Sequence, residues 1–138
     1  MKEKVLLDWE WVDSQIDKIG EKLEVFEKLQ FITGIPRGGL IPAVLMSHKF
    51  GIPFIGLELA KTLPGDLKRN VLVIDDIADT GDTLLQLQRH KFKTATLARR
   101  YSSSFTPLIV GEDITNDDWL VFPWESINSK TIQDYLAK

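Results

Sequence analysis

The sequence predicts an α/β fold with a central, mostly parallel sheet flanked by helices. Short apolar runs that suit strands alternate along the chain with segments of helical periodicity. The run Val71–Ile74 is continuous and apolar, which is typical of a parallel strand buried on both faces. The chain has 138 residues, of which 43% are apolar, so it can build one contiguous core. We therefore expect a single domain over residues 1–138.

The first predicted element is an amphipathic helix over about the first 20 residues. Asp8 can act as its N-cap, whereas Gly20 leaves the position of its carboxyl end open. Its apolar residues recur at steps of four, three and four: Val12, Ile16, Ile19 and Leu23.

A strand, a glycine turn and a second helix follow. The strand is the short apolar run Gln30–Ile35, and the turn is Pro36–Gly39. The helix is expected to begin at Pro42 and to end at Phe50, because proline suits a first helical turn and Gly51 suits a helix end.

The alternation continues to the end of the chain. Further strands are expected at Phe54–Leu59, Val71–Ile74, Thr94–Ala98 and Leu108–Val110. Helices are expected at Thr83–His90 and, with Ser129 as N-cap, at Lys130–Leu136.

Composition narrows the choice of partners and location. With 17 Lys and Arg against 20 Asp and Glu, the net charge is −3, so no overall positive charge favours nucleic acid or an anionic membrane. The absence of cysteine excludes disulfides, thiolate zinc sites and a cysteine nucleophile. The apolar run near Met1 is too short for a signal peptide, and no 18 apolar residues run without charge. We expect a cytoplasmic protein.

The most informative segment is 71–84, where a buried strand leads into acidic residues and a Thr-Gly-x-Thr turn. Ligands of open α/β sheets bind beyond the carboxyl ends of the strands. Backbone amides, the hydroxyls of Thr80 and Thr83 and the start of a helix can hold a phosphate there, and Gly81 allows close approach. An Asp-x-x-Thr sequence alone would indicate an acidic loop with a threonine cap, but the complete string favours phosphate binding.

This segment resembles the motif with which type I phosphoribosyltransferases bind phosphoribosyl pyrophosphate (PRPP). Residues 35–42 resemble the family's pyrophosphate loop, and residues 118–125 resemble the base-binding segment of its xanthine, guanine and hypoxanthine enzymes. The three segments occur in the family's order. The resemblance implies a phosphoribosyltransferase-like fold and transfer of the phosphoribosyl group to a nucleobase, a 6-oxopurine in the first place, as in purine salvage.

By this resemblance, Asp75 and Asp76 face the ribose hydroxyls and a magnesium ion, which prefers a few carboxylates plus water and ligand oxygens. Asp79 matches the acid that exchanges a proton with N7 of the base, and it can also favour positive charge on the ribose. The resemblance assigns the other PRPP and 5′-phosphate contacts to Ala78, Thr80, Gly81, Asp82 and Thr83. The Asp82 side chain is expected to point outward.

The pyrophosphate loop would use Pro36, Arg37, Gly38 and Gly39. Arg37 can neutralise the charge of the leaving group, while the two glycines expose amide groups to it. The family's loop often contains a cis peptide, which corresponds to the bond between Pro36 and Arg37. Without the other motifs, Arg-Gly-Gly could equally be a plain turn between strand and helix.

For the base, the resemblance implies stacking on Trp119 and hydrogen bonds from the Leu120 backbone. A single tryptophan in a hydrophobic edge strand can also serve packing alone. The family's purine enzymes place a lysine against O6 of the base, and the matching residue here is Arg99, which could donate with its guanidinium.

The chain also departs from the family in its hood. Only eleven residues, Ala60–Asn70, stand where the family has a long mobile segment that closes over PRPP. Lys61, Lys68 or Arg69 could reach the pyrophosphate, in the same or a neighbouring subunit of an expected homodimer or homotetramer. The shortened hood and Arg99 keep open the alternative of a regulatory protein that senses PRPP or a nucleotide without turnover. An enzyme that uses another base, such as a pyrimidine, is a third possibility.

Overall fold

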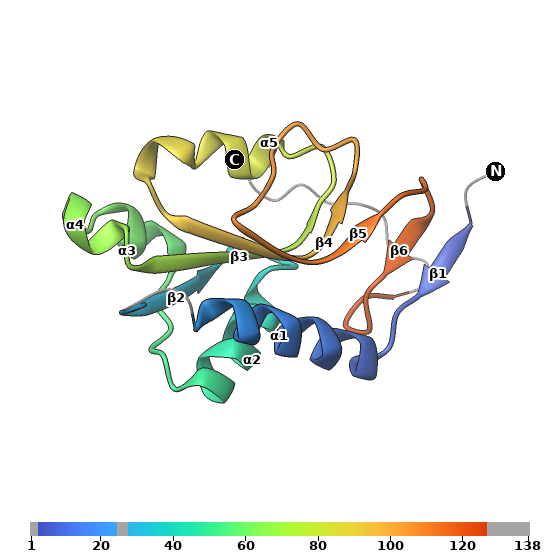
Figure 1. Cartoon of the computed structure of the whole chain (residues 1–138), viewed down its shortest axis with the longest axis horizontal. Helices are drawn as coiled ribbons and strands as arrows, with labels where there is room; N and C mark the ends of the chain where they lie inside the picture. Colours follow the sequence, from blue (N-terminus) through green and yellow to red (C-terminus); the bar gives the residue numbers. More distant parts are fainter. Residues whose placement is uncertain (1–2, 25–27, 127–138) are drawn as a thin grey trace.

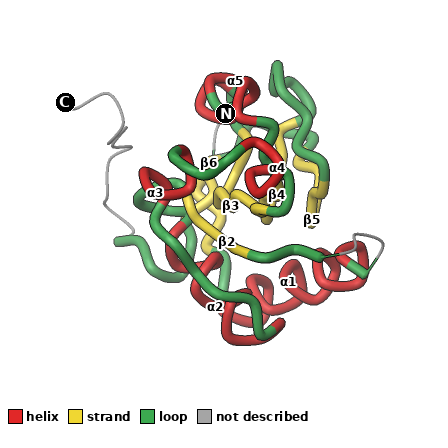
Figure 2. Tube along the Cα trace, turned by 90° about the vertical axis from the view of Figure 1, so that its left-hand side faces the viewer, coloured by secondary structure: helices red, strands yellow, loops and turns green. Residues whose placement is uncertain are grey.

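The computed structural model describes residues 3–24 and 28–126, and their centre is a four-stranded sheet in the order β2-β3-β4-β5. Its strands are β2 (Phe31–Gly34), β3 (Val71–Ala78), β4 (Lys93–Arg100) and β5 (Ile109–Ile114), and every pairing between them is parallel. Helices α1 (Trp9–Leu23) and α2 (Leu40–Phe50) cover one face, and α5 (Asp82–Gln86) covers the other (Figures 1 and 2). The predicted α/β class with a parallel sheet is therefore confirmed.

Helix α1 forms as its apolar spacing predicts. The Asp8 carboxylate accepts a hydrogen bond of 2.8 Å from the Trp11 amide, which caps the helix. The helix continues past Gly20 to Leu23, and an added Cβ at Gly20 would lie 2.7 Å from the ring of Phe50. Gly20 therefore allows α1 and α2 to pack closely. The stripe that the sequence indicated is buried against the sheet: Val12, Ile16, Ile19 and Leu23.

Helix α2 begins at Leu40, two residues before the proline that was expected to open it, with Gly39 at its N-cap. It ends at Gly51, which adopts the left-handed conformation (φ 67°) as predicted.

One predicted strand is wrong. Phe54 makes only a single parallel bridge, to Ile32, and helix α3 (Leu57–Lys61) begins three residues later. Leu57 and Ala60 pack into the core cluster on the α5 face, so the apolar spacing here is the three residues of a helix and not the two of a strand. Helix α4 (Gly65–Lys68) follows, and the short η1 (Gln88–His90) comes after α5.

A second, smaller sheet was not predicted. Strand β1 (Lys4–Leu6) pairs in parallel with β6 (Trp119–Val121), with Val5 opposite Leu120. All three β1 residues are exposed. This sheet carries the segment that resembles a base-binding region, and it lies beside β5 (Figure 1).

Strand β3 is longer than expected, because it continues from Ile74 through both acidic residues to Ala78. Its side chains alternate normally up to Ile74, with Val73 in the core cluster on the α5 face and Ile74 in the cluster under α1 and α2. Beyond Asp76 the alternation shifts by one residue, since Ile77 packs on the α1 side and Ala78 on the α5 side. The shift lies at the acidic pair.

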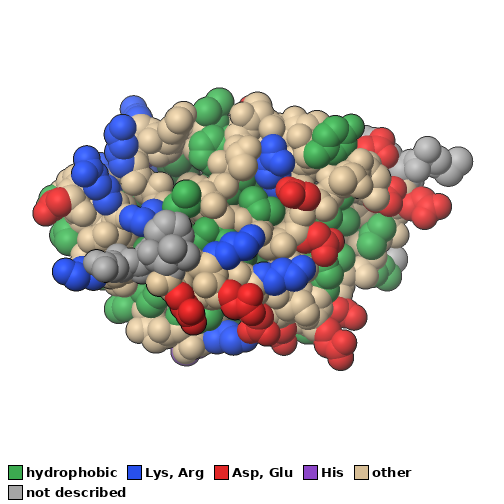
Figure 3. Space-filling view, in the orientation of Figure 1, with side chains coloured by type: hydrophobic (Ala, Val, Ile, Leu, Met, Phe, Trp, Pro, Cys, Tyr) green, Lys and Arg blue, Asp and Glu red, His purple; other side chains and the backbone are tan. Residues whose placement is uncertain are grey.

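The shortened hood lies far from the end of β3 that carries the acidic pair. Lys68 Nζ lies 3.2 Å from Nδ1 of His90, just before the amino end of β4, and Lys93 donates to the carbonyl of Arg69. Burial, and then the charge of Lys68, lower the pKa of His90. Lys and Arg side chains gather at this end of the molecule, on the left in Figure 3.

Two further expectations concern the chain ends and the membrane. The C-terminal helix predicted over Lys130–Leu136 lies outside the described residues. Within residues 3–24 and 28–126, no helix has the length and apolar character needed to cross a bilayer.

Candidate functional site

The acidic pair lies near the carboxyl end of β3, where both side chains are half-buried. The Asp75 carboxylate accepts from the amide of Asp76 (2.9 Å), and the Asp76 carboxylate accepts from the amide of Ile77 (2.7 Å). Burial raises the pKa of both groups, and for Asp75 the neighbouring charge of Asp76 raises it further. A site that disfavours two negative charges in this way suits a partner that supplies positive charge or hydrogen-bond donors.

The glycine loop between β2 and α2 packs directly against this pair. An added Cβ at Gly38 would come within 2.0 Å of Asp76 Oδ2, and one at Gly39 within 2.3 Å of the Ile74 carbonyl oxygen. Only glycine allows these approaches. The bond between Pro36 and Arg37 is cis, at the position that the family resemblance indicated, and Arg37 is exposed.

The segment after β6 carries a further acid whose charge acts on Asp76. Glu125 accepts from the amide of Phe122 (2.8 Å), and its charge is close enough to raise the pKa of Asp76. Gly38 and Asp76, which are far apart in the sequence, thus lie in contact, and the charge of Glu125 acts on the same carboxylate.

The Thr80–Thr83 turn packs closely against the loop that follows β4. Gly81 has a φ of 90°, and an added Cβ there would lie 2.6 Å from Ser103 Oγ and from the Phe105 amide nitrogen. The Thr80 carbonyl accepts from the amide (2.8 Å) and the hydroxyl (2.7 Å) of Ser104. The loop after β4 therefore holds the turn in place through these two hydrogen bonds.

Asp82 and helix α5 complete the turn. The Asp82 side chain is exposed, as expected, and its amide donates to Thr80 Oγ1 (3.2 Å). Helix α5 has five residues instead of the eight expected. Because so short a helix has a weak dipole, an anion at this turn would depend on the turn's amides and hydroxyls.

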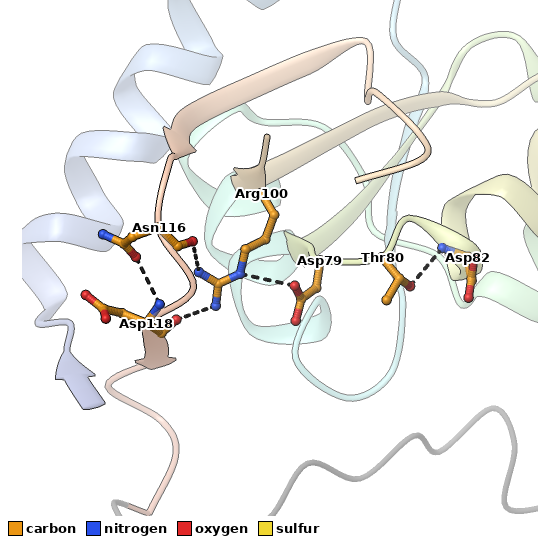
Figure 4. Close-up of polar contacts among 6 residues, drawn as sticks. All are labelled: Asp79, Thr80, Asp82, Arg100, Asn116 and Asp118. Atoms are coloured by element: carbon orange, nitrogen blue, oxygen red, sulfur yellow. Dashed lines mark hydrogen bonds and ion pairs between the residues drawn. The ribbon is translucent and has the colours of Figure 1, made fainter. Parts of the chain in front are cut away.

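Asp79 is held by Arg100, the last residue of β4 (Figure 4). Arg100 Nε donates to Asp79 Oδ1 over 3.1 Å, while its Nη1 donates to the carbonyl of Asn116 over 3.0 Å. Its Nη2 donates to the carbonyl of Asp118, which precedes Trp119. Arg100 was not among the residues that the sequence indicated.

A polar cavity of about 440 Å³ opens beside this cluster. Residues at and just beyond the carboxyl ends of β3, β4 and β5 line it: Asp79, Arg100, Tyr101, Ser102, Thr115, Asn116 and Asp117. The cavity is open to solvent next to Asp79, so a planar polar molecule can approach that carboxylate. An apolar hollow of about 410 Å³ between α1 and α2, lined in part by Leu23, Phe50 and Ile52, contains none of the predicted site residues.

The three residues assigned to the base lie in different environments. Trp119 is 40% exposed and its ring lies 5.2 Å from Lys4 Nζ, whereas Leu120 is buried. Arg99 forms an ion pair with Asp113 on β5, with 3.5 Å between Nη1 and Oδ1. Adjacent strand residues point to opposite sides of a sheet, so Arg99 and Arg100 serve different partners.

The donor set suits magnesium only in combination with a ligand. No group of three or more histidine, cysteine or acidic residues in the described part of the chain could hold a metal by itself. Asp75 and Asp76 supply two carboxylates, and magnesium commonly takes one or two carboxylates together with water and substrate phosphates. The residues present therefore fit a magnesium ion that arrives with PRPP.

Comparison with known proteins gives a consistent result. No family model matches the sequence. The structure is similar to a purine phosphoribosyltransferase from Pyrococcus horikoshii OT3, with 33% identity and a TM-score of 0.75 over 95% of this chain and 99% of that one. A xanthine-guanine-hypoxanthine phosphoribosyltransferase from Helicobacter pylori shares 19% identity and a TM-score of 0.73 over 90% and 93% of the two chains.

The fold is also shared with an enzyme for a different base. An orotate phosphoribosyltransferase from Aeropyrum pernix matches with a TM-score of 0.53 and 17% identity, over 75% of this chain and 69% of that one. Similarity at this level concerns the fold alone.

Proposed function

The chain belongs to the type I phosphoribosyltransferase family, and from this premise we propose that it transfers the 5-phosphoribosyl group of PRPP to a 6-oxopurine, releasing pyrophosphate. Guanine, xanthine and hypoxanthine are the candidate bases. The observation that carries the proposal is the contact between Gly38 and the Asp76 carboxylate. It joins the loop assigned to the leaving pyrophosphate to the acids assigned to the ribose.

In this proposal the Thr80–Thr83 turn binds the 5′-phosphate, and the loop Pro36–Gly39 binds the pyrophosphate. Gly38 packs against the Asp76 carboxylate and Gly81 packs against Ser103 and Phe105, at positions where a side chain would collide, so glycine is required to form both loops. Arg37 supplies positive charge to the leaving group. Holding both ends of PRPP orients the ribose carbon that is attacked.

Asp75 and Asp76 bind the ribose hydroxyls and would hold the magnesium ion. When bound, magnesium supplies positive charge that stabilises the departing pyrophosphate. The two carboxylates become easier to ionise when donors or a cation face them, which offsets the effect of their burial.

Asp79 accepts the N7 proton of the incoming base, and its negative charge favours the positive charge that develops on the ribose. The cavity beside Asp79 leaves that carboxylate accessible, and Trp119, Leu120 and Arg99 are not among the residues that line it. Trp119 would stack on the base and the Leu120 backbone would bind its edge. Arg99, which the resemblance assigned to O6, pairs with Asp113 on the side of the sheet opposite the Arg100–Asp79 contact, so we do not assign it to the base.

We propose a purine and not a pyrimidine as the acceptor, because the chain is 33% identical to a purine phosphoribosyltransferase over nearly its whole length. The match to the orotate enzyme does not weigh against this, since it reflects the fold. A cytoplasmic role in purine salvage, as a homodimer or homotetramer, completes the proposal. The exposed side chains of Leu6 and Trp9 are candidate subunit contacts.

The test is a panel of acceptor bases. The protein is incubated with PRPP, magnesium and, separately, guanine, hypoxanthine, xanthine, adenine or uracil, and the products are identified by mass. We expect a nucleoside monophosphate with at least one 6-oxopurine. Transfer to adenine or uracil alone would contradict the proposed substrate class, and PRPP binding without transfer to any base would favour a sensor.

A further inference from the structure

Arg100 and Asp79 form an ion pair in which one side chain is buried and the other is exposed. The Asp79 side chain is 64% exposed, whereas that of Arg100 is only 11% exposed. An exposed aspartate by itself can populate several rotamers, and an ordinary surface ion pair contributes little to stability. In this pair the arginine is the fixed member.

Arg100 is fixed because its guanidinium makes two further hydrogen bonds, to backbone carbonyls. Nη1 donates to Asn116 over 3.0 Å and Nη2 donates to Asp118. The planar guanidinium of arginine carries donors on three nitrogens in fixed directions, so it can reach three separate acceptors. Lysine has three donors on a single nitrogen and cannot span the same acceptors. Figure 4 shows the guanidinium between the carboxylate on one side and the two carbonyls on the other.

The two carbonyls that Arg100 binds, those of Asn116 and Asp118, belong to the loop just before Trp119 and the segment assigned to the base. Asn116 Oδ1 accepts from the Asp118 amide (3.0 Å), which closes the loop into a turn. The next amide, that of Trp119, donates to the carbonyl of Glu3 (2.8 Å) and so continues into the β1–β6 sheet. Through Arg100, the start of this sheet is linked to Asp79.

We propose that Arg100 is a positioning residue that sets the distance between Asp79 and the base-binding segment. It thereby holds the proton-transfer carboxylate at one place relative to a base bound at Trp119. This inference rests on the proposed function and extends it to a residue that the family resemblance did not indicate. Arg100 itself touches neither PRPP nor the base in this scheme.

The test measures kcat and the KM values for PRPP and the base in four variants: Arg100→Gln, Arg100→Lys, Asp79→Asn and the double variant Asp79→Asn/Arg100→Gln. A misplacement of about 1 Å can cost about 100-fold in rate, so Arg100→Gln should lower kcat by roughly 10- to 100-fold. The KM for the base should rise about tenfold by the same loss of alignment. The KM for PRPP should stay within about twofold, since the Thr80–Thr83 turn is supported by the separate contact to Ser104.

The double variant separates positioning from a general structural effect. Asp79→Asn should lower kcat by about 10²- to 10⁴-fold, the usual contribution of acid–base assistance. If Arg100 acts through Asp79, adding Arg100→Gln should lower kcat by less than about threefold more, because the two residues act as one unit. Arg100→Lys keeps the charge but not the fork, and it should recover part of kcat while the KM for the base remains raised.

Lys22→Met is the matched control, because Lys22 also donates to a backbone carbonyl, that of Val110 (2.9 Å), but far from Asp79. It should leave kcat and both KM values unchanged. Should Arg100→Gln fail to fold, as judged by circular dichroism, Arg100→Lys carries the test alone.

Two outcomes with an active wild-type enzyme would overturn the inference while leaving the proposed function intact. One is an Arg100→Gln variant with unchanged kcat and base KM, and the other is a double variant whose rate loss equals the product of the single losses. A wild-type protein that transfers to no base would instead overturn the proposed function, and this inference with it.

Discussion

At the scale of single residues, Asp75 illustrates how a binding group can lower the stability of the ligand-free protein. Burial, followed by the charge of Asp76, raises the pKa of Asp75 well above its ordinary value. The folded state therefore favours the protonated carboxyl. This contribution to stability is fully present below the unfolded-state pKa, and it is lost as the pH rises through the folded-state pKa. Above the folded-state pKa, the ionised Asp75 carboxylate opposes folding.

We therefore predict that Asp75→Asn raises the melting temperature of the ligand-free protein at about pH 7, and that the gain shrinks toward about pH 4, near the ordinary pKa of aspartate. Asparagine keeps the oxygen that accepts from the Asp76 amide. Thermal unfolding followed by circular dichroism over this pH range is the measurement. The control is Asp13→Asn on the exposed side of α1. A lower melting temperature at every pH would show that the Asp75 carboxylate stabilises the fold.

Individual residues also differ in how well the sequence could predict them. Asp75, Asp76 and Asp79, the Thr-Gly-x-Thr turn and the Arg-Gly-Gly loop could be proposed from the sequence, because each residue type suits one part of PRPP. Arg100 could not be found in this way. The doublet Arg99-Arg100 ends a strand, so one side chain points to each side of the sheet, and the sequence does not say which faces Asp79. Two of the three hydrogen bonds of Arg100 depend on a loop 16 to 18 residues further along the chain.

At the scale of elements, the phosphate turn depends on the loop that follows β4. Gly81 combines a positive φ of 90° with a position where a Cβ would lie 2.6 Å from two atoms of that loop. We predict that Gly81→Ala lowers both the melting temperature and the affinity for PRPP, the latter by at least about tenfold. The reason is that backbone strain of about 1–3 kcal/mol and the collision with Ser103 both displace the turn.

Gly51→Ala provides the control that separates these two causes. Gly51 also has a positive φ, 67°, but an added Cβ there meets nothing within 4 Å. This variant should lose stability through strain alone and should bind PRPP as the wild type does. Calorimetric titration with PRPP and magnesium distinguishes the two variants. Equal affinities in both would mean that the turn tolerates displacement.

Elements with a strong local pattern were predictable, and those that depend on distant partners were not. Helix α1 has a cap and a clear apolar stripe, and β3 has a continuous apolar run, so both appear in the sequence. Strand β1 has three exposed residues and no periodicity, and its partner β6 begins 115 residues after it. The apolar residues 54–59 were misassigned to a strand because so short a run fits either a strand or a helix.

At the scale of the whole molecule, the two ends of the sheet have different characters. The carboxyl ends of the strands carry the acidic pair, the glycine loop and Asp79, while Lys61, Lys68 and Arg69 belong to the short segment at the amino ends. Strand β3 separates these ends by about 23 Å at about 3.3 Å per residue. Within one chain, Lys68 and Arg69 therefore lie at the end of the sheet opposite the acidic pair.

This separation predicts how PRPP binding responds to neutralising variants at each end. Lys68→Met should leave the KM for PRPP within about twofold of the wild-type value, since its nearest polar partner is His90 and the surrounding water screens a charge more than two Debye lengths from the site. Arg37→Met should raise that KM by about tenfold or more through the loss of a charge-assisted contact to the pyrophosphate. Both values are measured by initial rates at saturating base. A raised KM in Lys68→Met would indicate that a neighbouring subunit brings this lysine to the site, and sedimentation of the variant with and without PRPP would then test that assembly directly.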